Sequence, residues 1–203
     1  MKPPCESKCK LLRVATQLVW ENSYGSVSVD DICKEAGVRK GSFYYFFPSK
    51  ADLTIAAMEE DWHQSRARLD EVFSCQTPPV ERLERYCDMS EAHQRHKAEE
   101  FGKVCGCPVL TLGAELSTLH ENIRLKAVEI MERYIKYFES AVRDAQAEGL
   151  IQTSNASATA RQLFAYSQGV LMDAKIRNDL TLLADMRAGM FQLLNLAPET
   201  RAA

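Results

Sequence analysis

Two short helical segments separated by a single glycine constrain the fold of this chain more than any other feature of its sequence. Ser28 and Asp31 have the spacing of a capping box, which predicts that a helix begins after Ser28. Gly37 tolerates a positive φ and is expected to end that helix, and residues 39–46 predict a second short helix. The apolar residues of the first helix recur at helical spacing: Val29, Ile32 and Ala36. The segment therefore predicts a helix, a tight turn and a helix.

The rest of the chain also predicts helices, and few runs resemble strands. A helix of roughly four turns is expected before the break at residues 22–25. The later helices are expected to cover residues 50–74, 80–101, 120–148, 155–177 and 180–194, with another beginning at Pro108. We therefore expect an all-α protein of about nine helices. It divides into a helix-turn-helix domain over residues 1–50 and a larger helical domain over residues 51–203.

Charge is unevenly distributed along the chain. Residues 1–50 contain eight Lys or Arg and five Asp or Glu, whereas the whole chain has a net charge of −3. A basic part on an acidic body suits a protein that approaches a polyanion with one face. No apolar run is long enough to cross a membrane, and the first ten residues lack the apolar centre of a signal peptide. We therefore expect a protein of the cytoplasm with no membrane partner.

The second short helix carries most of the side chains that suit DNA. In helix-turn-helix proteins the second helix enters the major groove while the first crosses the backbone. Gly41 allows a close approach, and Lys50, with the amides that follow Ser49, is placed to bind a phosphate. Phe43 and Phe47 are expected in the core. The side chains that offer charge or hydrogen bonds are Arg39, Lys40, Ser42, Tyr44 and Tyr45. Taken singly, each of these is equally consistent with a solvated surface position.

Residues 27–50 resemble the signature of the TetR (tetracycline repressor) family of bacterial DNA-binding regulators. The residues that match it are Ser28, Asp31, Ile32, Ala36, Gly37, Val38, Lys40, Gly41, Ser42, Phe43, Tyr44, Phe47, Ser49, Lys50 and Leu53. So many matches over about 25 residues are more specific than a helix-turn-helix pattern alone. Three positions depart from it: Ser23 stands in place of a glycine, Val27 in place of a threonine, and Phe46 in place of a polar residue, often histidine.

The resemblance implies a role for each matching residue. Lys40 and Gly41 are expected near base edges. The expected phosphate contacts are Ser42, Tyr44, Tyr45 and Lys50, and Ser28 and Arg39 complete the DNA-binding set. The resemblance further implies a homodimer, most often a repressor, that binds a palindromic double-stranded DNA operator. An unidentified small-molecule effector is expected to bind the helical domain over residues 51–203 and to release the DNA. No cofactor is predicted.

The last two helices carry regular apolar stripes. These stripes either pack within one chain or form a four-helix interface between two chains, and the sequence favours the dimer interface. The residues concerned are Leu163, Val170, Ala174, Leu183, Met186, Met190 and Leu193.

Large apolar side chains of the second domain either line an effector pocket or form plain core, and the sequence cannot separate the two. The candidates for the pocket are Trp62, Tyr86, Met89, Phe101, Tyr134, Phe138 and Tyr166, with Met131 beside them.

Cys107 is the candidate sensor of the effector domain. The seven cysteines lack the spacing of a disulfide framework, so reduced thiols are expected. If Pro108 opens a helix, Cys107 lies at its N-cap, where the helix dipole stabilises a thiolate. Cys105 is a possible resolving thiol, and Lys103 adds positive charge. The segment GCPVLTLGAELS also resembles a subgroup of TetR regulators, some of which respond to electrophiles or oxidants. The alternative is that Cys107 is a small buried apolar residue.

Other classes of function find little support in the sequence. His93 and His96, three residues apart, can be drawn with the cysteines as a metal site, but two histidines on a charged helix face are usually solvated, and no metal is predicted. No phosphate loop, nucleophile elbow or paired carboxylates indicate an enzyme. The remaining alternative is a helical partner-binding module without affinity for DNA. The departures from the family signature at Val27 and Phe46 are the features that point to it.

Overall fold

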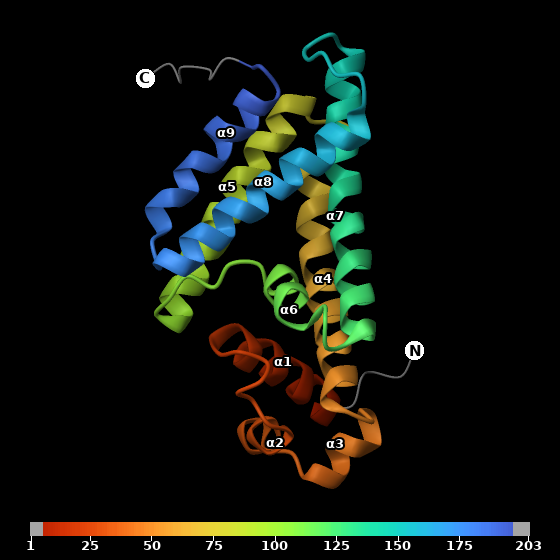
Figure 1. The fold of residues 1–203 in the computed structure, drawn as a ribbon, viewed down its shortest axis with the longest axis vertical. Helices are drawn as coiled ribbons and strands as arrows, with labels where there is room; N and C mark the ends of the chain where they lie inside the picture. Colours follow the sequence, from red (N-terminus) through yellow and green to blue (C-terminus); the bar gives the residue numbers. More distant parts are fainter. Residues whose placement is uncertain (1–5, 197–203) are drawn as a thin grey trace. The chain divides into compact units, whose positions relative to one another are not determined.

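The computed structural model describes residues 6–196, and within them every regular element is a helix (Figure 1). The elements are α1 (Glu6–Glu21), α2 (Val29–Ala36), α3 (Lys40–Phe46), α4 (Lys50–Val72), α5 (Pro79–Phe101), α6 (Pro108–Leu116), α7 (Glu121–Ala147), α8 (Ala156–Arg177), η1 (Leu180–Ala184) and α9 (Asp185–Leu193). The all-α prediction of about nine helices is confirmed. None of the described helices is both long enough and apolar enough to cross a membrane.

The ends of α2 are formed by the residues that the sequence indicated. The Asp31 amide donates to Ser28 Oγ at 3.1 Å, and the Ser28 amide donates back to Asp31 Oδ2 at 2.8 Å. These two bonds satisfy amides that have no partner within a helix, which is what a capping box does. Gly37 closes the helix in the left-handed conformation, with φ +63°. Both predicted boundaries of α2 are therefore confirmed.

The final helix differs from its prediction. Residues 180–194 were expected to form one helix, but η1 is a separate 3-10 turn and α9 begins at Asp185. The Asp179 side chain accepts a hydrogen bond from the Thr181 amide at 2.8 Å and so caps η1. Apolar spacing is similar in the two kinds of helix over one turn, so periodicity alone did not separate them.

The chain folds as two compact units, and the division differs from the predicted boundary at residue 50. The first unit contains the described residues up to Ser65 together with Pro108–Ile130, and the second contains Arg66–Cys107 and the described residues from Met131 onward. Helix α6 and the start of α7 therefore belong to the same unit as the helix-turn-helix. No local pattern in the sequence indicates that such a distant segment joins the N-terminal helices.

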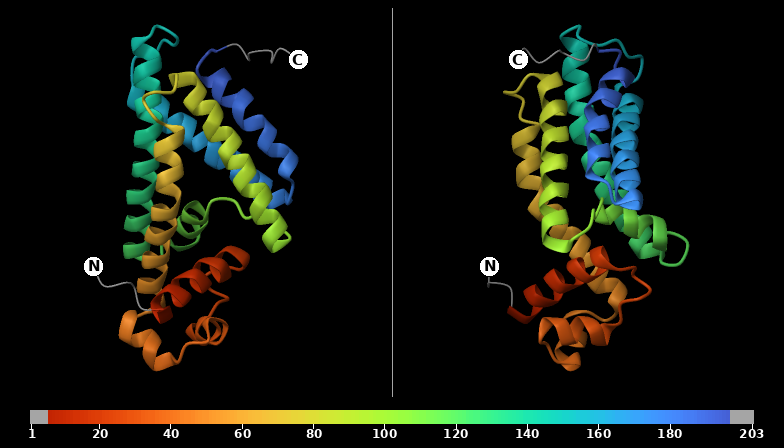
Figure 2. Two further views of the ribbon diagram at one scale, coloured as in Figure 1. Left: turned by 180° about the vertical axis from the view of Figure 1, so that it is seen from behind. Right: turned by 90° about the vertical axis from the view of Figure 1, so that its left-hand side faces the viewer.

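The core of the first unit fixes the positions of α2 and α3. Side chains from α1, α2, α3 and the start of α4 meet in one apolar cluster, and Phe43 of α3 is fully buried in it. Figure 2 shows these helices from two further sides. The buried members of the cluster are Leu11, Val14, Ala15, Val27, Ile32, Cys33, Ala36, Phe43, Phe47, Leu53 and Ala57. This core leaves the outer faces of α2 and α3 open to a partner.

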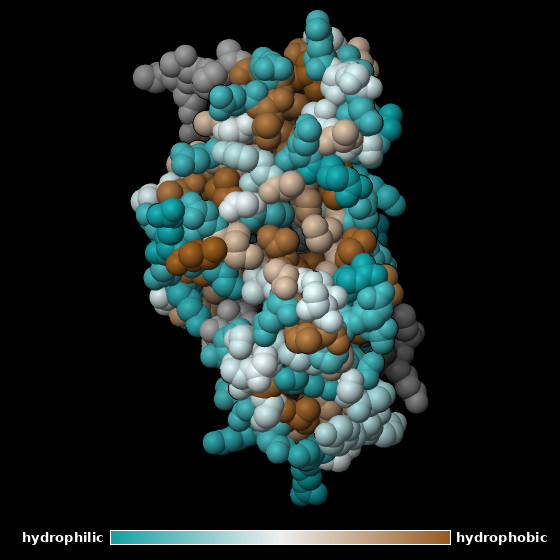
Figure 3. Space-filling view, in the orientation of Figure 1, coloured by the Kyte–Doolittle hydropathy of each residue, from teal (hydrophilic) through white to brown (hydrophobic). Residues whose placement is uncertain are grey.

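The second unit is a helical bundle with an aromatic centre. The ring of Phe138 lies 4.7 Å from that of Tyr86 and 6.0 Å from that of Phe164, in edge-to-face arrangements that suit aromatic pairs. Helices α5, α8 and α9 pack against one another beside this centre (Figure 1). On the face shown in Figure 3, apolar residues reach the surface in several separate patches, as is usual for a globular protein.

His93 of α5 makes the stability of the second unit depend on pH. Burial, with added repulsion from Arg68 and Lys97, lowers the pKa of His93 from 6.5 to about 4. Between these values the unfolded chain binds a proton that the folded chain does not, so the free energy of unfolding should fall as the pH falls from about 6.5 to about 4, by on the order of 1–3 kcal/mol.

Urea unfolding at a series of pH values measures this effect in the wild type, in His93→Gln and in His96→Gln. His93→Gln should lose much less stability over that range. His96 is exposed, and His96→Gln should behave as the wild type does. Equal pH dependence in all three proteins would contradict the assignment to His93.

Candidate functional site

Helix α3 presents one apolar face to the core and one polar face to solvent. Phe43 and Phe47 are buried, as predicted, whereas the side chains of Tyr44 and Tyr45 are 51% and 82% exposed. A large aromatic residue left this exposed on a helix next to a tight turn is available to a partner. Since Phe43 anchors the helix, the outward direction of these tyrosines is fixed by the core.

The other predicted side chains of α3 lie beside the two tyrosines. Arg39, Lys40 and Gly41 are exposed, and Ser42 is half-buried. No atom outside the helix backbone lies within 4 Å of a Cβ added to Gly41, so a flat target can approach the backbone there. The structure therefore gathers most of the predicted DNA-binding residues on one exposed face.

The ammonium group of Lys40 is paired with an acid of the preceding helix. Its Nζ lies 2.7 Å from the Asp30 carboxylate, and both side chains are more than half exposed. This partner raises the pKa of Lys40, through the hydrogen bond and the opposite charge. A phosphate or a base edge has to compete with Asp30 for the same ammonium group.

Replacing Asp30 with asparagine should therefore strengthen DNA binding. The substitution removes a negative charge from the binding face and weakens the hold on Lys40, so affinity should rise by roughly two- to fivefold at moderate salt. Fluorescence anisotropy with a labelled duplex measures the change, and Glu35→Gln on the same helix is the control for net charge. Unchanged or weaker binding by Asp30→Asn alone would contradict this role of Asp30.

Two residues predicted to contact DNA have partners inside the protein. The Ser28 hydroxyl donates its proton to Asp31 Oδ2 at 2.6 Å. Lys50 Nζ donates to the carbonyl oxygens of Tyr24 and Val27 at 2.8 and 2.7 Å, and it lies 3.8 Å from the centre of the Tyr24 ring. Ser28 therefore caps α2 and Lys50 holds the turn before it, and the phosphate contacts predicted for these two side chains stay predictions.

Two of the departures from the family signature have a structural account. Val27 is 5% exposed and packs in the core of the first unit, where a valine methyl is as suitable as a threonine hydroxyl. Phe46 is half-buried and packs against the same core. Packing in the core of the first unit therefore accounts for both side chains.

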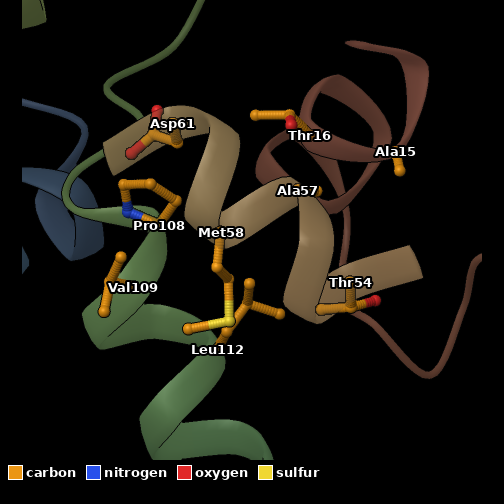
Figure 4. A pocket seen from close by; sticks show the side chains of 9 residues that line it. All are labelled: Ala15, Thr16, Thr54, Ala57, Met58, Asp61, Pro108, Val109 and Leu112. Carbon is orange, nitrogen blue, oxygen red and sulfur yellow. The ribbon is translucent and has the colours of Figure 1, made fainter. Parts of the chain in front are cut away.

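A small cavity lies in the first unit where α1, α4 and α6 meet (Figure 4). Its volume is about 20 Å³, which is room for a single water. Met58 and Leu112 point toward each other across it in Figure 4. The hydroxyls of Thr16 and Thr54 at its edge donate to backbone carbonyls of their own helices. The lining residues are Ala15, Thr16, Thr54, Ala57, Met58, Asp61, Pro108, Val109 and Leu112. None of these was predicted as a ligand contact.

The seven predicted pocket residues have different surroundings. Trp62 belongs to the first unit and the other six to the second. Tyr86, Phe138 and Tyr134 join the aromatic centre, whereas Tyr166 Oη donates to the Asp185 carbonyl. Phe101 lies under the Lys97 ammonium group, 5.0 Å from it. Met89 lines an open groove of about 310 Å³ between α4 and α5. Trp62, Tyr86 and Phe138 are buried core, whereas the other four are partly exposed, and a pocket lined by them stays a prediction.

Most of the predicted dimer stripe is core of a single chain. Five of its seven residues are 3% exposed or less, because α8 and α9 turn these faces toward each other and toward α5. These five side chains are core of one chain, and the dimer interface itself stays a prediction. They are Leu163, Ala174, Leu183, Met186 and Met190. Val170 is half-buried, and Leu193 is 45% exposed.

The loop before α6 is held by Gln94 of α5. The Gly106 amide donates to Gln94 Oε1 at 2.8 Å, and Gln94 Nε2 donates to the Gly106 carbonyl at 3.1 Å. Cys107 directly precedes the first residue of α6, as predicted, and it is half-buried. Cys105 is 1% exposed, and its thiol donates to the Lys103 carbonyl. Of the two candidate thiols, only Cys107 reaches the surface.

The second unit contains buried polar groups that the sequence did not indicate. The Tyr86 hydroxyl bonds to Ser90 and Ser167, and burial raises the pKa of Tyr86 to about 12, with Cys107 adding to the effect. Gln168 is 6% exposed, and its Oε1 atom has no hydrogen-bond partner. Such an acceptor is costly in a core, and a native protein usually has a reason to keep it. No three His, Cys, Asp or Glu side chains between residues 6 and 196 are grouped to hold a metal ion.

Comparison with known proteins identifies the class of the chain. Residues 11–57 match the family of bacterial regulatory proteins called the tetR family, and residues 79–190 match the tetracyclin repressor-like C-terminal domain. The chain belongs to the TetR family. It is accordingly a transcriptional regulator with a DNA-binding helix-turn-helix.

Named relatives of the regulator agree with this assignment. The transcriptional regulator AcuR of Cereibacter sphaeroides is 32% identical over 82% of this chain and 75% of its own length. The transcriptional repressor DhaR of a Mycobacterium species, strain GP1, is 27% identical over 91% of this chain and 90% of its own. A solved structure, the regulatory protein TetR from Rhodobacter sphaeroides, has a TM-score of 0.83 at 27% identity, covering 93% of this chain and 99% of that one.

Proposed function

We propose that the regulator is a homodimeric repressor that recognises a palindromic operator with α3. The single observation that carries the proposal is the exposed face of α3, where Arg39, Lys40 and Tyr45 surround Gly41 while Phe43 anchors the helix. Two copies related by a twofold axis present two such helices to half-sites about one helical turn, ~34 Å, apart. We further propose that the protein has no catalytic activity and acts in the cytoplasm, where its operator lies.

Selection of duplexes from a random library by the wild-type protein tests this proposal. Footprinting of the selected duplex should then reveal an inverted repeat whose half-site centres are about ten base pairs, or a multiple of one turn, apart. An enriched single half-site would contradict the dimeric arrangement. Failure to enrich any sequence would contradict operator recognition.

The exposed side of α8 supports a dimer interface different from the predicted stripe. Ala165, Gly169 and Ile176 share one exposed side of α8, and the small residues allow a second helix to approach closely. Ile176 is 75% exposed, although it is large and apolar. Ala184, at the end of η1, and Ala188 of α9 are two further small exposed residues.

Ile176→Glu should separate the two chains. A carboxylate at the centre of an apolar interface is desolvated without a partner, so the dissociation constant of the dimer should rise at least tenfold. Sedimentation velocity measures the oligomeric state, and Leu119→Glu, at a leucine 72% exposed in the first unit, is the matched control. If Ile176→Glu remains a dimer at the concentrations where the wild type does, this side of α8 is not the interface.

We also propose that an effector acts on the second unit beside Cys107. Two buried polar groups of this unit support the proposal, because Gln168 Oε1 offers an acceptor to a ligand with a hydrogen-bond donor, and Tyr86 lies close enough to Cys107 for their charges to interact. An electrophile that binds beside Cys107 reacts with its thiol at the start of α6, where the helix dipole favours the thiolate.

N-ethylmaleimide tests the thiol. The Cys107 sulfur adds to one carbon of the maleimide double bond, and a proton from the thiol or from water ends on the other carbon. Alkylation should then weaken binding of the selected duplex by the wild type and by Cys75→Ser, the control at an exposed cysteine of the same unit. Cys107→Ser should keep its affinity. Release of Cys107→Ser to the same extent as the wild type would contradict a sensing role for Cys107.

A further inference from the structure

The turn between α1 and α2 is held by two charged side chains from distant parts of the chain. The Glu115 carboxylate of α6 accepts a hydrogen bond from the Tyr24 amide at 3.1 Å and another from the Gly25 amide at 3.2 Å. Lys50 donates to the carbonyls of Tyr24 and Val27. An anion therefore binds the donors of this turn, and a cation binds its acceptors. All of these residues lie within the first unit.

The surroundings of Tyr24 strengthen this arrangement. The tyrosine is 8% exposed, and its ring contacts both the Lys50 ammonium group and the ring of His120, whose centre is 5.6 Å away. Burial lowers the pKa of Lys50, and the negative charge of Glu115 opposes that effect. The two charges therefore act on each other across the turn. Partial burial makes such bonds stronger than the same bonds in water.

The turn determines where α2 begins. Val27, its last residue before the cap, is buried in the core of the first unit, and its amide donates to the Tyr24 carbonyl. Ser28 follows directly with the capping box of α2. Helix α2 then packs against α3. Any displacement of the Tyr24 and Gly25 amides is therefore passed to the first residues of α2 and from there to α3.

We propose that Glu115 is a positioning residue for DNA recognition: by holding the Tyr24 and Gly25 amides, it fixes the start of α2 and hence the presentation of α3. Helix α6 thus takes part in operator binding without touching DNA. The proposal rests on operator recognition by α3 and adds a residue 65 positions beyond Lys50, where the helix-turn-helix segment ends.

Glu115→Gln tests the role of the carboxylate. A glutamine of the same size keeps one acceptor oxygen but turns an NH2 group toward the second amide, so one of the two bonds is lost. Affinity for the selected duplex should fall about tenfold, which corresponds to the loss of one hydrogen bond to a charged group. Amide hydrogen exchange at Tyr24 and Gly25 should become faster.

The dependence of affinity on salt separates positioning from direct contact. A residue that neutralises a phosphate changes the slope of log affinity against log salt, whereas a positioning residue changes the affinity and leaves the slope as it was. Glu115→Gln should have the wild-type slope. Glu121→Gln makes the same change of charge in the same unit and should bind at least as tightly as the wild type. Glu115→Asp keeps the charge but shortens the side chain, and it should be weakened as Glu115→Gln is.

The outcomes that overturn the proposal are distinct. Wild-type affinity in both Glu115 variants, a changed slope, or unchanged exchange at Tyr24 and Gly25 would each do so. All affinities are measured below the temperature at which circular dichroism first detects unfolding of either variant, so a loss of folded protein does not imitate the effect. If the wild type enriches no duplex, operator recognition itself fails, whereas wild-type binding without an effect of Glu115 overturns this inference alone.

Discussion

Replacing Arg82 with methionine should lower the free energy of unfolding by about 2–4 kcal/mol, which is a large fraction of the stability of a typical domain. The guanidinium group is 3% exposed and makes three contacts: Nε donates to the Thr77 carbonyl at 2.7 Å, Nη1 to Asp144 at 2.5 Å and Nη2 to the Cys75 carbonyl at 3.4 Å. Methionine fills much of the same space but makes none of these bonds. The Thr77 carbonyl then loses its charged partner.

Urea unfolding followed by circular dichroism measures this loss. Arg85→Met is the matched control, since Arg85 lies almost one turn further along α5 and pairs with Glu81 on the exposed surface. Its substitution should change stability by less than about 0.5 kcal/mol. Asp144 is 43% exposed, so water solvates it once Arg82 is removed, and the expected loss stays below that for a fully buried ion pair. Equal midpoints for the two variants would contradict a structural role for Arg82.

Enlarging Gly41 should affect stability and DNA binding in opposite directions. A Cβ at this position meets no atom of the folded protein, and alanine is favoured over glycine in a helix by about 1 kcal/mol. Gly41→Ala should therefore be at least as stable as the wild type. Where α3 faces the base edges, however, added atoms separate the helix from the groove, and affinity for the selected duplex should fall by about ten- to a hundredfold.

Gly41→Leu extends the series. Its larger side chain should weaken binding further while the helix remains intact by circular dichroism. Because the variants differ only in size at one exposed position, a graded loss of affinity indicates close approach of the backbone to DNA. Affinities that do not change from glycine to alanine to leucine would show that α3 meets DNA elsewhere, or not at all.

Local signals in the sequence predicted the elements of the fold well. The capping box of Ser28 and Asp31, the glycine at the end of α2 and the proline that opens α6 each depend on residues close together in the chain, and each boundary lies where it was expected. The exposed face of α3 was also predictable, because the apolar residues Phe43 and Phe47 identify the opposite face.

Long-range contacts account for what the sequence did not predict. A lysine at position 50 has the charge that a phosphate contact needs. Nothing near Lys50 in the sequence indicates that its ammonium group donates to carbonyls of the turn before α2. Glu115 lies about ninety residues along the chain from the two amides whose hydrogen bonds it accepts. Similarly, the stripe on α9 was correctly recognised as apolar, but periodicity does not say whether Met186 and Met190 are covered by the same chain or by another.

The salt dependence of DNA binding tests the central claim of a DNA-binding regulator most directly. The measurement is the affinity of the wild type for the selected duplex and for a scrambled duplex of the same composition, between about 50 and 300 mM salt. Tighter binding of the selected duplex, with log affinity falling linearly as log salt rises, is the predicted result. Binding that does not change with salt and does not distinguish the two duplexes would contradict the account.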